Sequence, residues 1–398
     1  MGEIICTERA SVLEKGIFSL WKNDRNDTGI NLAFGFKVEN LERERLERSV
    51  NQIVARHPRL RSTFFEKDGI VFRNTLDSVR VSIEDFSSDN LRDFIRPFNL
   101  FEGPLLRIAL RPDGSTVLFD ISHIVTDGFS MAVFFSELDA FYSSGKVDYE
   151  PQQIPPENET ELLENTSYWA KAFKNDFKNL LLPRDKKGSL SYGGEGSSLV
   201  HKIGRRMTKK VLERCRSLSI TPFVFYFSAF LLFLSRECGS NDVVTVTNLS
   251  CRSGKSIRAI GLLATLAPVR VSVDEKMTSD EFLGKMNLLV REYLVHQRYD
   301  NEKLLSELGF SDMRDFSRTI FTYEHEKIAD IRLDGKKCDY VPIPSLHSSN
   351  DLSLCFFPFK TESRLLVIFR VDLFSHARAR RFARHYVDAI QSLLEGEL

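Results

Sequence analysis

The feature that most limits the possible folds is an alternation of strand-like and helix-like segments that occurs in both halves of the chain. In the first half, apolar residues between Leu41 and Arg56 fall on one helical face, and strand-like stretches follow: "RSTFFEKDGIVFRN", "VRVSIEDF", "LLRIAL" and "TVLFDIS". In the second half, helix-like segments separate strand-like ones such as "DVVTVTNLS", "APVRVSV" and "RLLVIFRVD". Helices of this kind bury their apolar face on a sheet, so each half predicts an α/β sandwich.

The two halves meet at a segment of different composition, between Val147 and Ser198. It begins with the polar, proline-rich "YEPQQIPPENET" and ends with the loop-like "PRDKKGSLSYGGEGSS", with a short Trp-bearing helix between them. A chain of 398 residues exceeds one ordinary core, since domains usually run to about 100–200 residues. We therefore expect two lobes, residues 1–175 and residues 176–398.

Charge and hydropathy exclude several kinds of partner. Lys plus Arg and Asp plus Glu both number 55, so no net charge draws the chain to nucleic acid or to an anionic membrane. The most apolar run, from Thr221 to Leu234, has 14 residues, fewer than the roughly 20 that a bilayer-spanning helix needs. We interpret it as a buried helix, and we expect neither a nucleic-acid nor a membrane partner.

The six cysteines are scattered along the chain, without a CxxC pair and without a His at metal-ligand spacing. This pattern predicts reduced, mostly structural thiols and no metal site. The N-terminal "MGEIICTERA" is unlike a signal peptide, because Glu3 and Glu8 flank a very short apolar piece. We expect a cytoplasmic protein.

The stretch "ISHIVTDGFS", residues 121–130, is the strongest candidate for chemistry. It places His123 at the end of a predicted strand, and an Asp-Gly pair begins the next helix. A strand end holds a side chain rigidly, Asp127 can fix the turn through a cation or backbone groups, and Gly128 allows close approach of a ligand or another backbone. A neutral, oriented His is suited to taking a proton from an attacking amine or hydroxyl.

The sequence contains no GxSxG nucleophile elbow, no GxGxxG motif and no P-loop. Direct transfer to an acceptor therefore fits better than covalent catalysis. Such a reaction needs one base and a site that aligns the two reactants, and alignment alone contributes roughly 7–11 kcal/mol.

Blocks in a fixed order along nearly the whole chain resemble the condensation domains of nonribosomal peptide synthetases, within the chloramphenicol-acetyltransferase-like acyltransferase superfamily. "SHIVTDGFS" is similar to the HHxxxDG motif, "ARHPRLRSTFFEKDG" to the RHxxLRTxF block, and "SYWAKAFKNDFKNLLLPRD" to the Tyr/Trp helix with its Leu-Pro turn. "TPFVFYFSAFLLFL", "NLSCRSGK" and "IGLLATLAPVR" resemble the buried helix, the Ser-Gly-Arg strand and the IGxFxNTxPxR block.

The resemblance implies an α/β fold of two acetyltransferase-like lobes that form a V around a central tunnel. It maps the catalytic second His of the motif onto His123, the structural Asp onto Asp127 and the Gly onto Gly128. The family pairs that Asp with an Arg. Arg270 and Arg252 are the candidates here, and we favour Arg270.

The chain departs from the family pattern at several positions. The first His of the motif is Ser122, the Ser-Gly-Arg strand reads Ser250-Cys251-Arg252, and the Asn-Thr pair reads Thr265-Leu266. We expect Ser122, Ser250 and Thr265 to line the substrate tunnel. Ser250 and backbone N–H groups near Gly128 would help to hold an oxyanion.

By the resemblance, the donor is an acyl or aminoacyl group on the phosphopantetheine of a peptidyl or acyl carrier protein, and the acceptor is a small molecule. The sequence shows no adenylation or carrier blocks, so we expect a free-standing monomer, without a bound cofactor, that meets its carrier in trans. Two alternatives stay open: an O- or N-acyltransferase that uses acyl-CoA directly, or a catalytically inactive carrier-docking protein.

Overall fold

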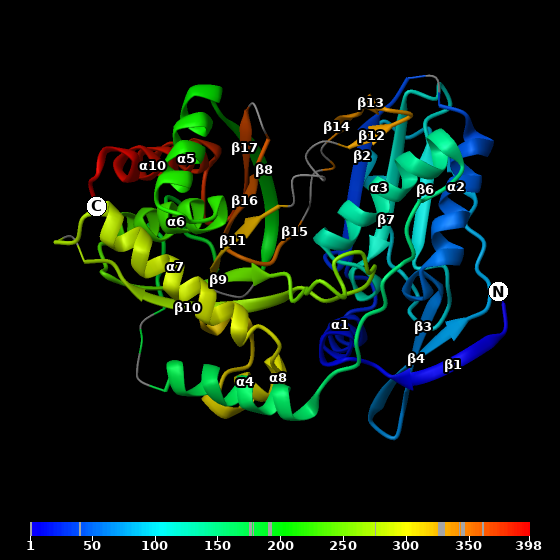
Figure 1. Cartoon of the computed structure of the whole chain (residues 1–398), viewed down its shortest axis with the longest axis horizontal. Helices are drawn as coiled ribbons and strands as arrows, with labels where there is room; N and C mark the ends of the chain where they lie inside the picture. The colour runs from blue at the N-terminus through cyan, green and yellow to red at the C-terminus, as the bar shows by residue number, and fades with distance from the viewer. Residues whose placement is uncertain are drawn as a thin grey trace. The chain divides into compact units, whose positions relative to one another are not determined.

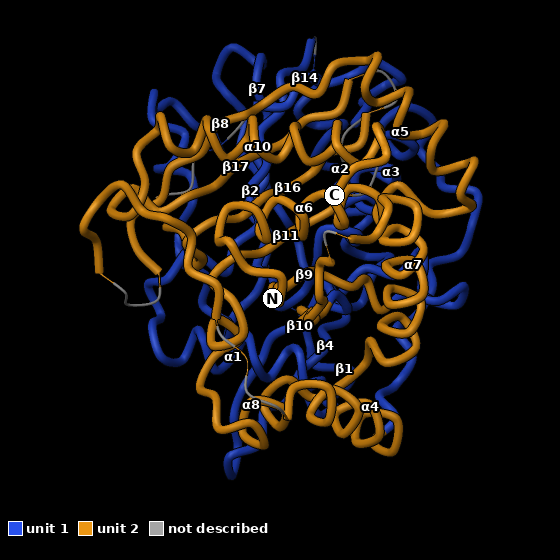
Figure 2. The backbone as a smooth tube through the Cα atoms, turned by 90° about the vertical axis from the view of Figure 1, so that its left-hand side faces the viewer, with its two compact units in different colours: residues 1–158, 252–264, 327–344 blue, residues 159–251, 265–326, 345–398 orange. Residues whose placement is uncertain are grey.

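The computed structural model describes residues 2–39, 41–174, 177, 179–189, 193–274, 276–324, 331–341, 343, 347–359 and 362–398. The chain forms two compact units (Figure 2). Unit 1 comprises residues 1–158, 252–264 and 327–344, and unit 2 comprises residues 159–251, 265–326 and 345–398. These units differ from the expected lobes, 1–175 and 176–398, because the helix after residue 158 belongs to unit 2 and two later segments join unit 1.

Unit 1 is built around a five-stranded sheet in the order β14-β2-β7-β6-β5 (Figure 1). The strands are β2 Asn31–Lys37, β5 Ile83–Asp85, β6 Leu106–Leu110, β7 Thr116–Ser122 and β14 Asp339–Val341. Helices α2 Arg43–Arg56 and α3 Gly128–Ser144 pack on this sheet. The side chains of Val117, Phe119 and Ile121 on β7 join the same buried core as both helices. Each large apolar side chain buried in this way contributes roughly 1.5–3 kcal/mol.

The rest of unit 1 adds a smaller sheet and short elements around this core. The small sheet has the order β1-β4-β3, with β1 Ile4–Arg9, β3 Ser62–Lys67 and β4 Ile70–Leu76. Helix α1 Val12–Asn23 begins with a capping box between Ser11 and Glu14. The remaining elements are the 3-10 helices Pro58–Arg61, Leu91–Phe94 and His123–Val125, and the hairpin of β12 Arg332–Leu333 and β13 Lys336–Lys337.

Unit 2 contains a seven-stranded sheet in the order β10-β9-β11-β16-β17-β8-β15. Its strands are β8 Gly194–Ile203, β9 Asp242–Leu249, β10 Thr265–Ser272, β11 Thr319–Tyr323, β15 His347–Ser348, β16 Leu352–Phe357 and β17 Ser363–Arg370. The α-helices described in unit 2 are α4 Glu159–Ala172, α5 Arg205–Ser217, α6 Pro222–Cys238, α7 Ser279–Val295, α8 Asn301–Leu308 and α10 His376–Glu395, and a 3-10 helix spans Met313–Asp315.

The predicted buried helix is α6. Thr221 caps its N-terminus by accepting a hydrogen bond from the Val224 N–H, and Gly239 ends it with φ +59. Every residue from Val224 to Ser235 is buried. Of the helices described, none alone has the length and apolar character to cross a bilayer, and α5 with α6 meets those criteria only as a pair bent by 110°.

Two segments from the second half of the sequence complete unit 1. Strand β14 pairs antiparallel with β2, with Val341 opposite Gly35. A side chain at Gly35 would come within 2.9 Å of the Val341 carbonyl oxygen, so glycine permits this pairing. The loop of residues 252–264 is the other segment, and it supplies contacts to the candidate site.

Candidate active site

The site is built where β7 ends and α3 begins. Ser122 is the last residue of β7, His123–Val125 form one 3-10 turn, and Asp127 is the N-cap of α3. The His123 N–H donates to the Ile30 carbonyl at 2.9 Å, and the His123 carbonyl accepts from the Thr126 N–H at 3.3 Å. These bonds fix the backbone of His123 at the edge of a buried strand.

The His123 ring is held in one tautomer by a backbone carbonyl. Its Nδ1 lies 2.8 Å from the Thr126 carbonyl oxygen. A carbonyl can only accept, so we assign the proton to Nδ1, which leaves the lone pair on Nε2. The half-buried imidazole is therefore prepared to accept a proton at Nε2, as a general base must.

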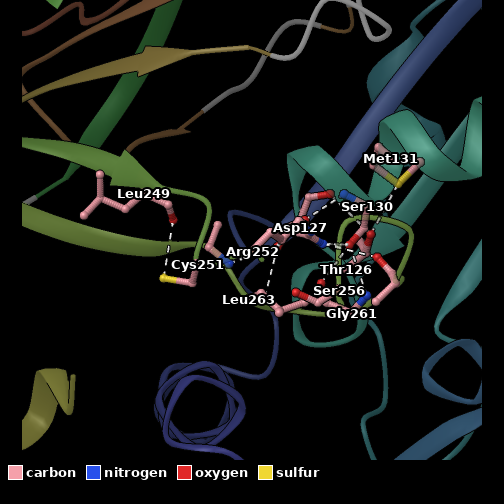
Figure 3. A network of polar contacts seen from close by, with 12 residues as sticks. Thr126, Asp127, Ser130, Met131, Leu249, Cys251, Arg252, Ser256, Gly261 and Leu263 are labelled. Carbon is pink, nitrogen blue, oxygen red and sulfur yellow. Dashed lines mark hydrogen bonds and ion pairs between the residues drawn. The ribbon is translucent and has the colours of Figure 1, made fainter. Parts of the chain in front are cut away.

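Asp127 is a buried anion with donors on both oxygens (Figure 3). Oδ1 accepts from the Ser130 N–H at 2.8 Å, which caps α3. Oδ2 accepts from Arg252 Nη1 at 2.8 Å and from the N–H groups of Leu263 and Ala264 at 2.9 Å each. Burial would raise the pKa of Asp127, but Arg252 and these hydrogen bonds outweigh it and lower the pKa.

The structure corrects the expected partner of Asp127, which is Arg252 and not Arg270. Arg252 opens the loop of residues 252–264, whose later N–H groups reach the same carboxylate. Arg270 lies within β10 and binds Asp242 through Nε at 2.9 Å and Nη2 at 2.8 Å. The local sequence around Arg252 and Arg270 does not show which of the two lies in unit 1 with Asp127.

Sequence reasoning missed Ser130, whose hydroxyl ties α3 to the same loop. Its Oγ donates to the Gly261 carbonyl at 2.7 Å and accepts from the Gly261 N–H at 3.0 Å and from Arg252 Nη2 at 2.7 Å. Gly128 is the first residue of α3. The signal for this contact in the sequence is Gly261 of "IGLLAT", which lies in the block similar to IGxFxNTxPxR.

The other predicted site residues divide between the units. Ser122 is fully buried in unit 1, and its Oγ has no hydrogen-bond partner among the described residues. Ser250, Thr265 and Arg270 belong to unit 2, so the structure does not bring them together with His123 within one unit. Ser250 is exposed, whereas the buried Thr265 Oγ1 accepts from Asn301 Nδ2 at 3.3 Å. Within the ranges described, no group of three His, Cys, Asp or Glu side chains has a metal-binding arrangement.

Comparison with known proteins gives consistent matches. The family model described as "Condensation domain" matches residues 9–396. Bacitracin synthase 1 from Bacillus licheniformis is 23% identical over 407 residues, which cover 96% of this chain and 8% of that relative. The chain thus spans less than a tenth of the length of this curated relative.

Two solved structures share the fold. The condensation domain from the monacolin K polyketide synthase MokA matches with a TM-score of 0.84 and 16% identity over 100% of this chain and 99% of that one. A doubly substituted variant of the starter condensation domain of rhizomide synthetase, solved in complex with C8-CoA and Leu-SNAC, matches with a TM-score of 0.81 and 17% identity over 98% of this chain and 95% of that one. The predicted α/β fold is confirmed, while the V-shaped arrangement and the tunnel stay predictions.

Proposed function

The chain belongs to the condensation-domain family, and we propose that it transfers an acyl or aminoacyl group from a phosphopantetheine thioester to an amine or hydroxyl acceptor with His123 as general base. Condensation domains are acyltransferases that form amide or ester bonds with carrier-bound substrates. The observation that carries the proposal is the His123 tautomer, because the Nδ1 contact with the Thr126 carbonyl leaves Nε2 as a proton acceptor.

In the proposed reaction, the acceptor nitrogen or oxygen attacks the thioester carbonyl and its proton passes to His123 Nε2. The tetrahedral intermediate then collapses, the carbon–sulfur bond breaks, and the proton returns to the leaving thiolate. Backbone N–H groups near Gly128 and the Ser250 hydroxyl are the proposed donors to the oxyanion. Asp127 and Arg252 hold the start of α3 and do not exchange protons with substrate.

The proposal includes the finer features expected from sequence. The donor is a peptidyl or acyl carrier protein acting in trans, the acceptor is a small molecule, and the protein works as a cytoplasmic monomer without a cofactor of its own. Ser122 and Thr265 are proposed to line the substrate path. An acyl-CoA donor is the second candidate, since a starter domain of the same fold was solved with C8-CoA.

The test is single-turnover acyl transfer by the full chain, followed by intact mass. Octanoyl-loaded carrier protein and octanoyl-CoA are compared as donors, with a panel of aminoacyl N-acetylcysteamine thioesters as acceptors. We expect His123→Ala to lose roughly 10²–10⁴ in rate. Wild-type turnover by this variant would remove the general-base role, and a faster reaction with octanoyl-CoA would favour the second candidate. Binding of the loaded carrier without any transfer would support a docking protein.

A further inference from the structure

A buried polar cluster lies on the face of β7 opposite its apolar core face, just before the candidate base. Asp120 is its centre and is completely buried. Its Oδ2 accepts from Arg107 Nη1 on β6 at 2.8 Å and from Asn31 Nδ2 on β2 at 3.2 Å, and it lies 3.5 Å from the Arg96 N–H. Side chains alternate along a strand, so Asp120 and Ser122 point to the same face.

This cluster leaves two oxygen atoms unsatisfied. Among the described residues, neither Asp120 Oδ1 nor Ser122 Oγ has a hydrogen-bond partner, and both atoms are buried. A buried polar atom without a partner costs roughly 1–3 kcal/mol. Asp120 and Ser122 are neighbours on one face of β7, and Ser122 directly precedes His123. Two unpaired buried oxygen atoms at this place lower stability, so we look for a role of this cluster in function.

The cluster is connected to His123 through β2. Asn31 pairs with Ser122 in the sheet register, and its side chain bridges Asp120 and the Arg96 carbonyl. The preceding residue, Ile30, accepts the His123 N–H. Asn31, which binds the Asp120 carboxylate, is therefore the neighbour in sequence of Ile30, which accepts the hydrogen bond from the His123 backbone.

The charged groups around Asp120 come from three elements. Arg107 on β6 forms the ion pair, and Arg96 donates through its backbone while its guanidinium binds Glu84 on β5 at 2.6 Å. Burial raises the pKa of Asp120 to about 6, although Arg107 lowers it. Asp120 thus changes charge close to neutrality, three residues before a base that must itself be neutral to act.

We propose that Asp120 is a positioning residue for His123, whose ionised carboxylate holds Asn31 and thereby the end of β7 in the geometry that the base requires. This inference rests on the proposed function of His123. When Asp120 gains a proton, its hydrogen bonds to Arg107 and Asn31 lose their charge assistance, so the Asn31 side chain is held less firmly.

The test follows the imidazole Cε1 signal of His123 by NMR in protein labelled with carbon-13 at its eight histidines, with His123→Ala assigning the signal. We expect the wild-type signal to show an inflection at about pH 6 that follows the charge change of Asp120. Asp120→Asn should remove this inflection. Asp113→Asn, on the exposed turn of the same hairpin, should keep it. Absence of this inflection in wild type, or the same inflection in Asp120→Asn, would overturn the inference.

A second labelling keeps the test open if Asp120→Asn does not fold. Wild-type protein is then labelled at the Asp side-chain Cγ, and a His123 Cε1 signal that does not respond where Asp120 changes charge overturns the inference. The NMR result does not depend on turnover, so a coupled titration in a protein without acyl transfer would refute only the proposed function.

Discussion

Removal of the Arg252 side chain is the most direct test of how the site is held together. Arg252→Ala leaves the Asp127 carboxylate buried with its backbone donors but without a cation. Asp127 is 0% and Arg252 2% exposed, so the pair belongs to the fully buried class. Breaking such a pair by removing one partner costs roughly 3–5 kcal/mol. The three backbone N–H groups that remain on Asp127 place the expected loss at about 3 kcal/mol.

Fluorescence can follow unfolding at a known place, because the chain has only two tryptophans. Trp21 lies in unit 1 and Trp169 in unit 2, and both are buried. In a Trp169→Phe background, urea unfolding followed by fluorescence therefore reports the transition that exposes Trp21.

Arg270→Ala is the matched control. Arg270 and Asp242 are 27% and 46% exposed, and pairs of this kind contribute at most about 1 kcal/mol. Because this pair is exposed, its loss should lower the stability reported by Trp21 by at most about 1 kcal/mol. If Arg270→Ala lowered the stability reported by Trp21 as much as Arg252→Ala does, the assignment of Arg252 to Asp127 would be wrong.

Two further predictions concern stability. Gly35→Ala places a Cβ 2.9 Å from the Val341 carbonyl oxygen; it should destabilise unit 1 by about 1–3 kcal/mol and speed hydrogen exchange in β14. Gly16→Ala lies in helix α1, and its new Cβ would have no atom within 4 Å apart from the adjacent residues and the backbone of its own helix, so it should not destabilise. Asp120 has its pKa raised from 3.8 to about 6, so its stabilising contribution is complete below pH 3.8 and is lost as pH rises through 6. Relative to Asp120→Asn, wild type should lose about 3 kcal/mol of unfolding free energy between pH 4 and 7, and equal pH dependence of the two proteins would contradict this.

The elements that sequence predicted best have strong local signals. The α6 helix is bounded by a Thr cap and a Gly, and its residues are apolar all round, which specifies a buried helix. The passage from β7 through His123 to α3 was equally clear, because β-forming residues end at an Asp-Gly pair. In both places the local propensity agrees with the tertiary structure.

The parts that could not be predicted depend on long-range contacts. Strand β14 has three residues, too few for a period of two to be seen, and it joins unit 1 only because β2 offers it an edge. The loop of residues 252–264 has no periodicity, and its role comes from N–H groups that meet Asp127. The error over Arg270 has the same origin, since a sequence shows that an Arg is present but not which carboxylate it reaches.

The contrast between Asp120 and Asp127 shows what decides the charge of a buried acid here. Both residues are fully buried, and each is paired with an Arg. Asp127 receives donors on both oxygens, and its pKa is lowered. The donors that Asp120 receives from the described residues all converge on Oδ2, and its pKa is raised. Burial is the largest influence on each group, so the number and placement of donors determine which acid stays ionised. We infer that Asp127 stays ionised and holds the start of α3, and that Asp120 on β7 is the acid that makes the site sensitive to pH.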